Sequence, residues 1–293
     1  MHRSILAPER TDWSTADAYD WCQRLAVGHY ENFPVASLLL PRTARPHIAA
    51  IYAFARIADD IADEPGMSNE ERLRLLNDWE KQLLEAKDGR ATHPVFAALS
   101  ESAFRLTIDY SLFTHLLSAF RQDVVKHRYM SFNELLDYCR RSANPVGRLV
   151  LQIFNFRDER MFELSDAICT ALQLTNFWQD MSVDGSAGRI YAPLEDLRRF
   201  GVAEEDILLR RGSASFANLM AYQVSRTREL FHQGRPLIAM LQSPVSLEIR
   251  LTWAGGMRIL DKIESSGYTV LQTRPRLRWT DGPTLLLQTL LDR

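Results

Sequence analysis

Residues 48–63 read IAAIYAFARIADDIAD, an apolar helical pattern that ends among three carboxylates. Side chains four residues apart lie on the same face of a helix, so Asp59 and Asp63 form a pair. Like charges at this spacing destabilise a helix by roughly 0.2–0.5 kcal/mol per pair, and aspartate is a mediocre helix former. The pair therefore needs a compensating interaction, and the residues around it are too apolar for a solvated helix.

A second polar row lies in residues 173–184, which read QLTNFWQDMSVD. Asp180 and Asp184 are again four residues apart, and Asn176 lies one turn before them. Mg²⁺ prefers oxygen ligands and is usually held by one or two carboxylates together with substrate phosphates. Two such rows facing each other would clamp a diphosphate through Mg²⁺ ions, and the pattern favours this function.

An isolated pair of aspartates at this spacing most often decorates a solvated helix, and that alternative applies to either row alone. Here no Lys or Arg follows Asp59 or Asp63 within a turn, and the nearest base is Arg56, one turn earlier. Both rows are embedded in apolar sequence, where a carboxylate needs a metal or another partner. The two rows together are therefore a much stronger signal than one.

Composition excludes several other functions. The net charge of −2 and the absence of a basic stripe argue against nucleic-acid binding. Three widely spaced cysteines and seven histidines without an HxxxH or HExxH pattern predict neither disulfides nor a histidine metal site. The N-terminus lacks the apolar segment of a signal peptide, and no apolar run approaches the ~20 residues that span a bilayer. We expect a soluble, cytoplasmic protein.

Nearly every segment follows the helical period, and we predict one all-α domain, residues 1–293, with its active site in the bundle core. Capping boxes, in which a serine caps a helix that carries Glu three residues on, occur at Ser68 and Ser131. The glycine-bearing segment 184–193 is either a lid over the metal site or a plain surface loop. The predicted helices cover residues 14–29, 44–63, 69–87, 94–105, 111–126, 132–141, 145–156, 160–182, 214–240, 245–266 and 283–291.

These motifs resemble those of the squalene/phytoene synthases, which are head-to-head prenyl transferases of the isoprenoid synthase fold. The resemblance runs from His29 to residues 274–277 and rests on Arg56-x-x-Asp59-x-x-x-Asp63 together with Gln173-x-x-Asn176-x-x-x-Asp180-x-x-x-Asp184. It implies a single helical bundle around a central cavity, Mg²⁺ as cofactor and a prenyl diphosphate as substrate.

The resemblance also implies roles for individual residues. The implied metal site consists of Asp59, Asp63, Asn176, Asp180 and Asp184. The implied substrate contacts are His29, Tyr30, Asn32, Arg56, Gln173, Asn176, Arg189 and Tyr191. Tyr138 is the implied cavity tyrosine that faces carbocation intermediates, and with the four aspartates it completes the catalytic set.

Finer features are similar to the bacterial hydroxysqualene synthases of hopanoid biosynthesis. They lie in residues 29–37 (HYENFPVAS) and 138–147 (YCRRSANPVG). Gln179 stands where many relatives have arginine, and this departure is compatible with an enzyme that performs only the second half-reaction. The implied reaction ionises presqualene diphosphate and captures the rearranged cation with water, and Asn32, Asn144 and Tyr138 are candidates for positioning that water. The alternative within the family is condensation of two prenyl diphosphates to presqualene diphosphate, squalene or phytoene.

Two alternative functions outside the prenyl transferases and two kinds of interaction partner are also considered. A metal-dependent phosphohydrolase would need paired His and Asp ligands, and a non-catalytic scaffold would not need intact carboxylate rows. A long hydrocarbon substrate implies peripheral contact with the inner face of the membrane, and other hopanoid-pathway enzymes are candidate partners. The leucines of residues 285–291 either bind that surface or pack on the core.

Overall fold

The computed structural model describes residues 10–28, 40–278 and 281–282. All regular secondary structure assigned within these ranges is helical, so the predicted all-α fold is confirmed. The substrate contacts expected at His29, Tyr30 and Asn32 lie outside the described residues, as does the helix expected over 283–291. Among the helices that are described, none is both long enough and apolar enough to span a bilayer.

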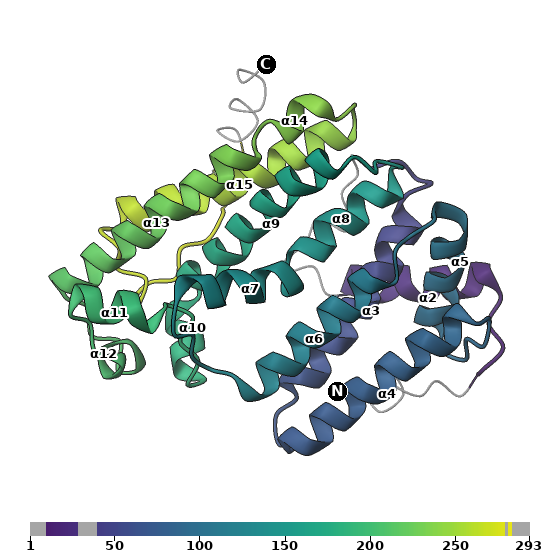
Figure 1. Cartoon of the computed structure of the whole chain (residues 1–293), viewed down its shortest axis with the longest axis horizontal. Coiled ribbons are helices and arrows are strands. Elements are labelled where there is room, and N and C mark those ends of the chain that lie inside the picture. Colours follow the sequence, from purple (N-terminus) through teal and green to yellow (C-terminus); the bar gives the residue numbers. More distant parts are fainter. Residues whose placement is uncertain (1–9, 29–39, 279–280, 283–293) are drawn as a thin grey trace. The chain divides into compact units, whose positions relative to one another are not determined.

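The chain gathers into two compact units, each built from two separate stretches of sequence (Figure 1). Unit 1 comprises residues 1–125 and 145–157, and unit 2 comprises residues 126–144 and 158–293. The first carboxylate row belongs to unit 1 and the second to unit 2. That residues 1–293 form one domain stays a prediction.

Unit 1 is organised around α3 (Arg45–Asp63), whose aromatic centre is Phe54. The Phe54 ring contacts Trp79, Phe96 and Phe113, which come from three different helices. Because the apolar face of α3 is buried in this core, its polar side chains lie on the accessible side. The helices packed against α3 are α2 (Thr15–Gly28), α4 (Asn69–Lys87), α5 (Pro94–Leu106) and α6 (Ser111–Val125), and most of α8 (Asn144–Ile153) also belongs to this unit.

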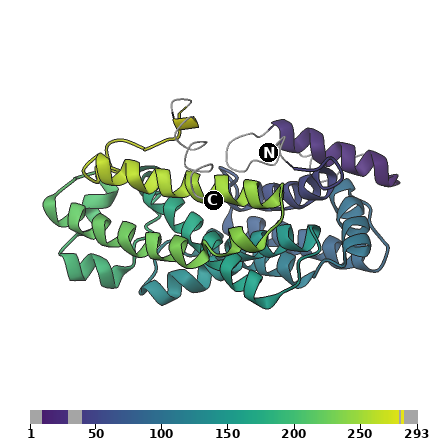
Figure 2. The same ribbon diagram turned by 90° about the horizontal axis from the view of Figure 1, so that it is seen from above.

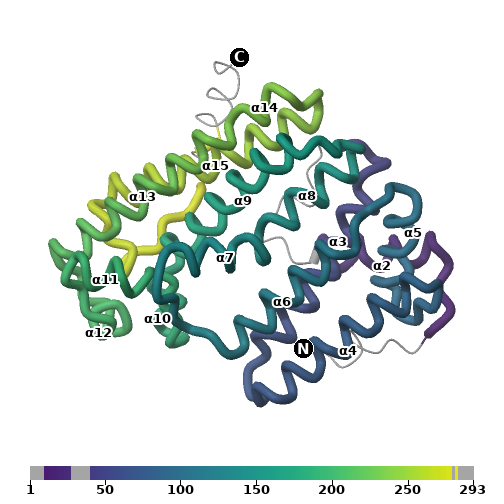
Figure 3. The backbone as a smooth tube through the Cα atoms, viewed as in Figure 1, coloured from purple at the N-terminus to yellow at the C-terminus, as the bar shows by residue number. Residues whose placement is uncertain are grey.

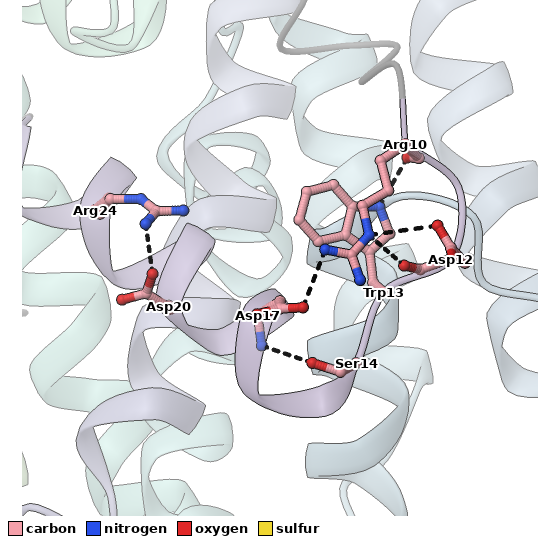
Figure 4. A network of polar contacts seen from close by, with 7 residues as sticks. All are labelled: Arg10, Asp12, Trp13, Ser14, Asp17, Asp20 and Arg24. Carbon is pink, nitrogen blue, oxygen red and sulfur yellow. Dashed lines mark hydrogen bonds and ion pairs between the residues drawn. The ribbon is translucent and has the colours of Figure 1, made fainter.

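Several helices begin where a serine caps the first turn. Ser68 and Ser131 each accept a hydrogen bond from the backbone N–H three residues later, as the capping-box pattern predicts. Ser14 accepts the same bond from Asp17 at the start of α2, where Arg10 also pairs with the Asp17 carboxylate at 3.0 Å (Figure 4). Local capping chemistry therefore explains these helix boundaries.

Unit 2 is organised around α9 (Glu159–Gln179), which lies beside α7, α13 and α15 (Figure 3). At Gly234 the helix α13 comes so close to α9 that a Cβ atom there would lie 2.5 Å from Cγ1 of Ile168. Only glycine permits this approach of the two backbones. The other helices of the unit are α7 (Phe132–Ser142), α10 (Met181–Ser186), α11 (Leu194–Phe200), α12 (Glu204–Leu208), α13 (Ala214–Gly234), α14 (Leu237–Met240) and α15 (Val245–Ser265).

The predicted helices differ from the structure in several places. The single helix expected over 214–240 is wrong, because Pro236 lacks an N–H and its ring clashes with the carbonyl four residues earlier, so α13 ends at Gly234. The helix expected over 160–182 ends at Gln179, and α10 begins after a turn at Asp180. The short helices α11 and α12 were not predicted, since seven and five residues are too few to show a period.

The three cysteines are free thiols that lie mainly in the protein interior. Cys22 and Cys139 are buried, Cys169 is partly buried, and all three are free thiols. Burial raises the pKa of the Cys22 thiol to about 12 and also raises the pKa of Cys139. Neither buried thiol is therefore suited to act as a nucleophile near neutral pH.

Candidate active site

The first carboxylate row lies at the C-terminal end of α3 in unit 1. Arg56 pairs with Asp60 at 2.7 Å and approaches Asp59 at only 4.0 Å. The Asp59 side chain is 51% exposed, and Asp63 is exposed as the last residue of the helix. The expectation that these carboxylates lie inside apolar surroundings is therefore wrong in this unit, because α3 buries the residues between them and turns the acidic face outward.

The second row keeps helical register although the helix is interrupted. The backbone N–H of Asp180 donates to the carbonyl of Asn176 at 2.8 Å, and that of Asp184 donates to the carbonyl of Asp180 at 2.9 Å. These are the i to i−4 bonds of a helix, so the three side chains follow one another along the same face. Asn176 is exposed, and Asp184 is partly buried. The predicted row of side-chain oxygen atoms is thus present at the junction of α9 and α10.

Asp180 has a cationic partner that sequence inspection did not find. Arg274 binds both carboxylate oxygens: Nη2 donates to Oδ2 at 2.8 Å, and Nε donates to Oδ1. Beside it, the amide of Gln179 donates to the carbonyl of Pro275 at 2.6 Å. The Asp180 side chain is only 17% exposed. A guanidinium held in this way compensates the negative charge at the centre of the row.

An aromatic cluster lies next to the second row in unit 2. Tyr191 stacks on Phe177 with ring centroids 3.7 Å apart and planes 9° from parallel. Tyr138 contacts the rings of Phe177 and Tyr191 at 6.0 and 6.2 Å, and Tyr129 contacts the rings of Tyr138 and Tyr191 at 5.6 and 5.7 Å. The structure therefore brings the predicted residues Tyr138 and Tyr191 together. Tyr129 is not apparent from the sequence, because it precedes α7 in a segment without helical period.

The segment that carries Arg189 and Tyr191 is fastened to the segment before α7. The backbone N–H of Ile190 donates to the carbonyl of His127 at 3.0 Å, and that of Leu194 donates to the carbonyl of Tyr129 at 2.8 Å. Arg128 donates to the carbonyl of Gly188 and pairs with Glu204, both at 2.5 Å. These contacts indicate that residues 188–194 form a fixed wall, which holds Tyr191 in place. They do not favour a mobile lid.

Two further candidates on or near α9 are also located. Gln173 lies on α9 three residues before Asn176 and is partly buried. Asn144 is buried, and its Oδ1 accepts a hydrogen bond from the hydroxyl of Thr170 at 2.9 Å. The amide oxygen of Asn144 thus joins the start of α8 to α9, and the water-positioning role of Asn144 stays a prediction.

The donor set fits Mg²⁺ by its chemistry. Both rows present carboxylate or amide oxygens, the hard ligands that this ion prefers. Within the described residues no group of three or more His, Cys, Asp or Glu side chains is gathered to hold a metal by itself. Mg²⁺ does not require such a cage, since it usually keeps water ligands and shares substrate phosphates with one or two carboxylates. The metal ligands and the facing of the two rows stay predictions.

Comparison with known proteins identifies the family. The sequence profile described as "Squalene/phytoene synthase" matches residues 26–281, which spans most of both units. The chain belongs to the squalene/phytoene synthase family. Members of this family are enzymes that use prenyl diphosphates, so the predicted enzyme class is confirmed.

Individual members of the squalene/phytoene synthase family resemble the chain over most of its length. It is 34% identical to the hydroxysqualene synthase of Rhodopseudomonas palustris over an alignment of 238 residues, and this alignment covers 80% of each protein. It is 31% identical over 278 residues to the phytoene synthase of Arthrospira platensis, which covers 90% of each. The crystal structure of squalene synthase HpnC from Alicyclobacillus acidocaldarius matches with 40% identity and a TM-score of 0.82, over 87% of this chain and 95% of that one.

Proposed function

We propose that this family member is a hydroxysqualene synthase, which ionises presqualene diphosphate and captures the rearranged cation with water. The observation that carries the proposal is the 40% identity to squalene synthase HpnC, over nearly the whole of that chain. The relative named hydroxysqualene synthase, at 34% identity, points to the same branch. The residues at 29–37 and 138–147 add the motif-level support described above.

The carboxylate rows would act on the departing diphosphate. Asp59 and Asp63 on α3, with Asn176, Asp180 and Asp184 on α9 and α10, would hold Mg²⁺ ions. When bound, Mg²⁺ supplies charge stabilisation of the leaving oxygens, worth several kcal/mol of barrier. The C–O bond breaks, and its electron pair leaves with the diphosphate. We assign the remaining diphosphate contacts to Arg56 and Arg189, whose guanidinium groups suit phosphate oxygens.

The aromatic cluster would stabilise the carbocation that remains after the diphosphate leaves. Tyr138, Phe177 and Tyr191 offer π faces to a positive carbon, an attraction worth roughly 0.5–2 kcal/mol per ring. Together with Gln173 they would line the substrate chamber and keep bulk water away until rearrangement is complete. One water then adds through its oxygen to the terminal cation and loses a proton to solvent or to the released diphosphate. Atoms and charge balance as hydroxysqualene plus diphosphate.

One specific observation favours a second function. The phytoene synthase of Arthrospira platensis is 31% identical over 278 residues, a longer match than that to the hydroxysqualene synthase. The alternative is therefore head-to-head condensation of two prenyl diphosphates. Gln179 bears on the choice, because a neutral side chain stands where a cation would help bind a second diphosphate. We infer that the enzyme performs only the second half-reaction.

A product assay with purified enzyme and Mg²⁺ tests the proposal. Presqualene diphosphate in H₂¹⁸O, without NADPH, should yield ¹⁸O-labelled hydroxysqualene and diphosphate. Farnesyl or geranylgeranyl diphosphate alone should yield no condensation product. An unlabelled alcohol, or squalene formed only with NADPH, would exclude water capture. Phytoene or presqualene diphosphate from the shorter substrates would establish the alternative.

The substrate chemistry extends the proposal to the membrane. Presqualene diphosphate and its product are long hydrocarbons, so the mouth of the chamber would contact the bilayer surface peripherally, beside other enzymes of the same pathway. Co-sedimentation with liposomes, compared with a variant lacking residues 283–293, measures this contact. Equal sedimentation of both proteins would exclude the C-terminal leucines as the surface-binding element.

A further inference from the structure

Arg274 reaches Asp180 from a segment that returns after the last long helix. The chain leaves α15 at Ser265 and turns back along it (Figure 2). It then places Arg274 on an aspartate that is 94 residues earlier in the sequence. We call residues 274–278 the arginine strap.

The arginine strap is held at two points that follow Arg274 in the sequence. At the first, the Gln179 amide donates a hydrogen bond to the Pro275 carbonyl at 2.6 Å. At the second, the buried carboxylate of Asp281 accepts a hydrogen bond from the backbone N–H of Arg278 at 2.6 Å. Asp281 is in turn fixed to α15 by Arg258 at 3.0 Å and Lys262 at 2.8 Å. The position of Arg274 is therefore built into unit 2 and is not a chance surface contact.

This contact has a consequence for any metal at the second row. A guanidinium that binds a carboxylate through two hydrogen bonds occupies one lone pair on each oxygen, so it competes with Mg²⁺ for that carboxylate. A guanidinium is a cation, so it also repels a divalent metal ion electrostatically. The pair therefore opposes metal binding by an amount that can be measured.

We propose that Arg274 is an internal counter-cation for Asp180, which it holds in the metal-free enzyme and releases when a divalent metal binds. The arginine strap is the element that positions it, and Gln179 fastens the strap beside the row. The inference rests on the proposed function in one respect, namely that Asp180 is a metal ligand. It concerns the state of the protein before substrate arrives.

Direct titration with Mn²⁺ in the absence of substrate tests this proposal. The free ion is counted from its paramagnetic resonance signal, so the readout does not depend on turnover. Arg274→Gln keeps a side chain of similar length but removes the charge, and it should tighten Mn²⁺ binding about tenfold, equivalent to 1.4 kcal/mol. Arg276→Gln is the matched control, because Arg276 is exposed on the same segment and loses the same charge.

A second variant guards against an unfolded protein. Asp281→Asn leaves Arg274 in place but weakens the anchor of the arginine strap, and it should tighten Mn²⁺ binding in the same direction by a smaller factor. Circular dichroism would verify that each variant keeps its helices. Two variants that act through different residues but move the affinity in the same direction would support the counter-cation role.

The Asp180→Asn variant separates the proposed metal site from the counter-cation role of Arg274. If Asp180→Asn leaves Mn²⁺ binding unchanged, Asp180 is not a metal ligand, and both the proposed metal site and the counter-cation role are overturned. If Asp180→Asn abolishes binding while Arg274→Gln binds no more tightly than Arg276→Gln, only the counter-cation role is overturned. Failure of folded Arg274→Gln to gain measurable Mn²⁺ affinity overturns it in the same way.

Discussion

Tyr191 lies flat on Phe177, with ring centroids 3.7 Å apart and planes 9° from parallel. This stack joins the segment after α10 to α9 one turn before Asp180. We expect Tyr191→Phe to keep the stack, the fold and most of the turnover. Tyr191→Ala should lower turnover at least tenfold and destabilise the fold by about 1–3 kcal/mol, since an aromatic pair contributes about 0.5–1.5 kcal/mol beyond area burial. Steady-state kinetics and chemical denaturation measure the two effects.

Tyr191→Phe and Tyr191→Ala together distinguish the contribution of the ring stack from that of the tyrosine hydroxyl. If Tyr191→Phe loses as much turnover as Tyr191→Ala, the hydroxyl group and not the ring carries the function. If neither variant changes turnover or product distribution, the aromatic cluster plays no part in the reaction.

The carboxylate rows carry the next prediction. We expect Asp59→Asn and Asp180→Asn to lower turnover at saturating Mg²⁺ by at least about 100-fold, because each removes a charged ligand that stabilises the leaving group. The helical circular dichroism signal of Asp59→Asn should not change, since Asp59 is half exposed and supports little of the core. Asp78→Asn on α4 is the control, because that side chain is similarly exposed, at 54%, and lies outside both rows.

Undiminished turnover in both Asp59→Asn and Asp180→Asn would contradict the metal site. A loss in one row alone would restrict metal binding to that row. A loss in Asp78→Asn of the same size would show that the assay reports general surface charge.

Much of the fold was predictable because helices carry their own local signals. The capping serines at 68 and 131 and the four-residue spacing of the aspartates are local features, and the structure contains both. The end of α13 was missed although Pro236 marks it, because the apolar period continues past that proline. The spacing of residues within one helix can thus be predicted from the sequence. A helix end that is marked by a single proline is easily overlooked.

The candidate site was less predictable, because its partners are distant in sequence. A search within one turn of each aspartate finds Arg56 but cannot find Arg274, which is 94 residues from Asp180. Likewise the exposure of Asp59 depends on which side of α3 packs on Phe54 and its neighbours. Burial and long-range ion pairs follow from tertiary packing, which a local pattern does not contain.

The fixed wall around Tyr191 gives a third prediction. Arg128→Gln should lower turnover more than Glu204→Gln, because only Arg128 also binds the Gly188 carbonyl. A double-mutant cycle should give about 0.2–1 kcal/mol of coupling between Arg128 and Glu204, the range of partly exposed ion pairs. Arg198→Gln, at an exposed position of α11, is the control. Equal effects of all three variants would mean that the Gly188 contact does not position the wall.

A pH dependence is expected in unit 1, where His47 joins α3 to two neighbouring helices. Its Nδ1 lies 3.1 Å from the Tyr19 hydroxyl on α2 and 2.8 Å from the Ser102 hydroxyl on α5. Burial, assisted by the positive charge of Arg105, lowers the pKa of His47 below its ordinary value. His47 therefore binds a proton more readily in the unfolded chain than in the folded chain.

The sign of the stability change follows from that lowered pKa. The His47 contribution is complete above the ordinary histidine pKa of about 6.5 and is lost progressively as the pH falls toward the lower folded value. Thermal denaturation followed between pH 7.5 and 5 should show a decline that is shallower in His47→Gln than in the wild type. His115→Gln is the matched control, because His115 is exposed on α6 in the same unit. If His47→Gln and His115→Gln show the same slope as the wild type, protonation of His47 does not limit the stability of unit 1.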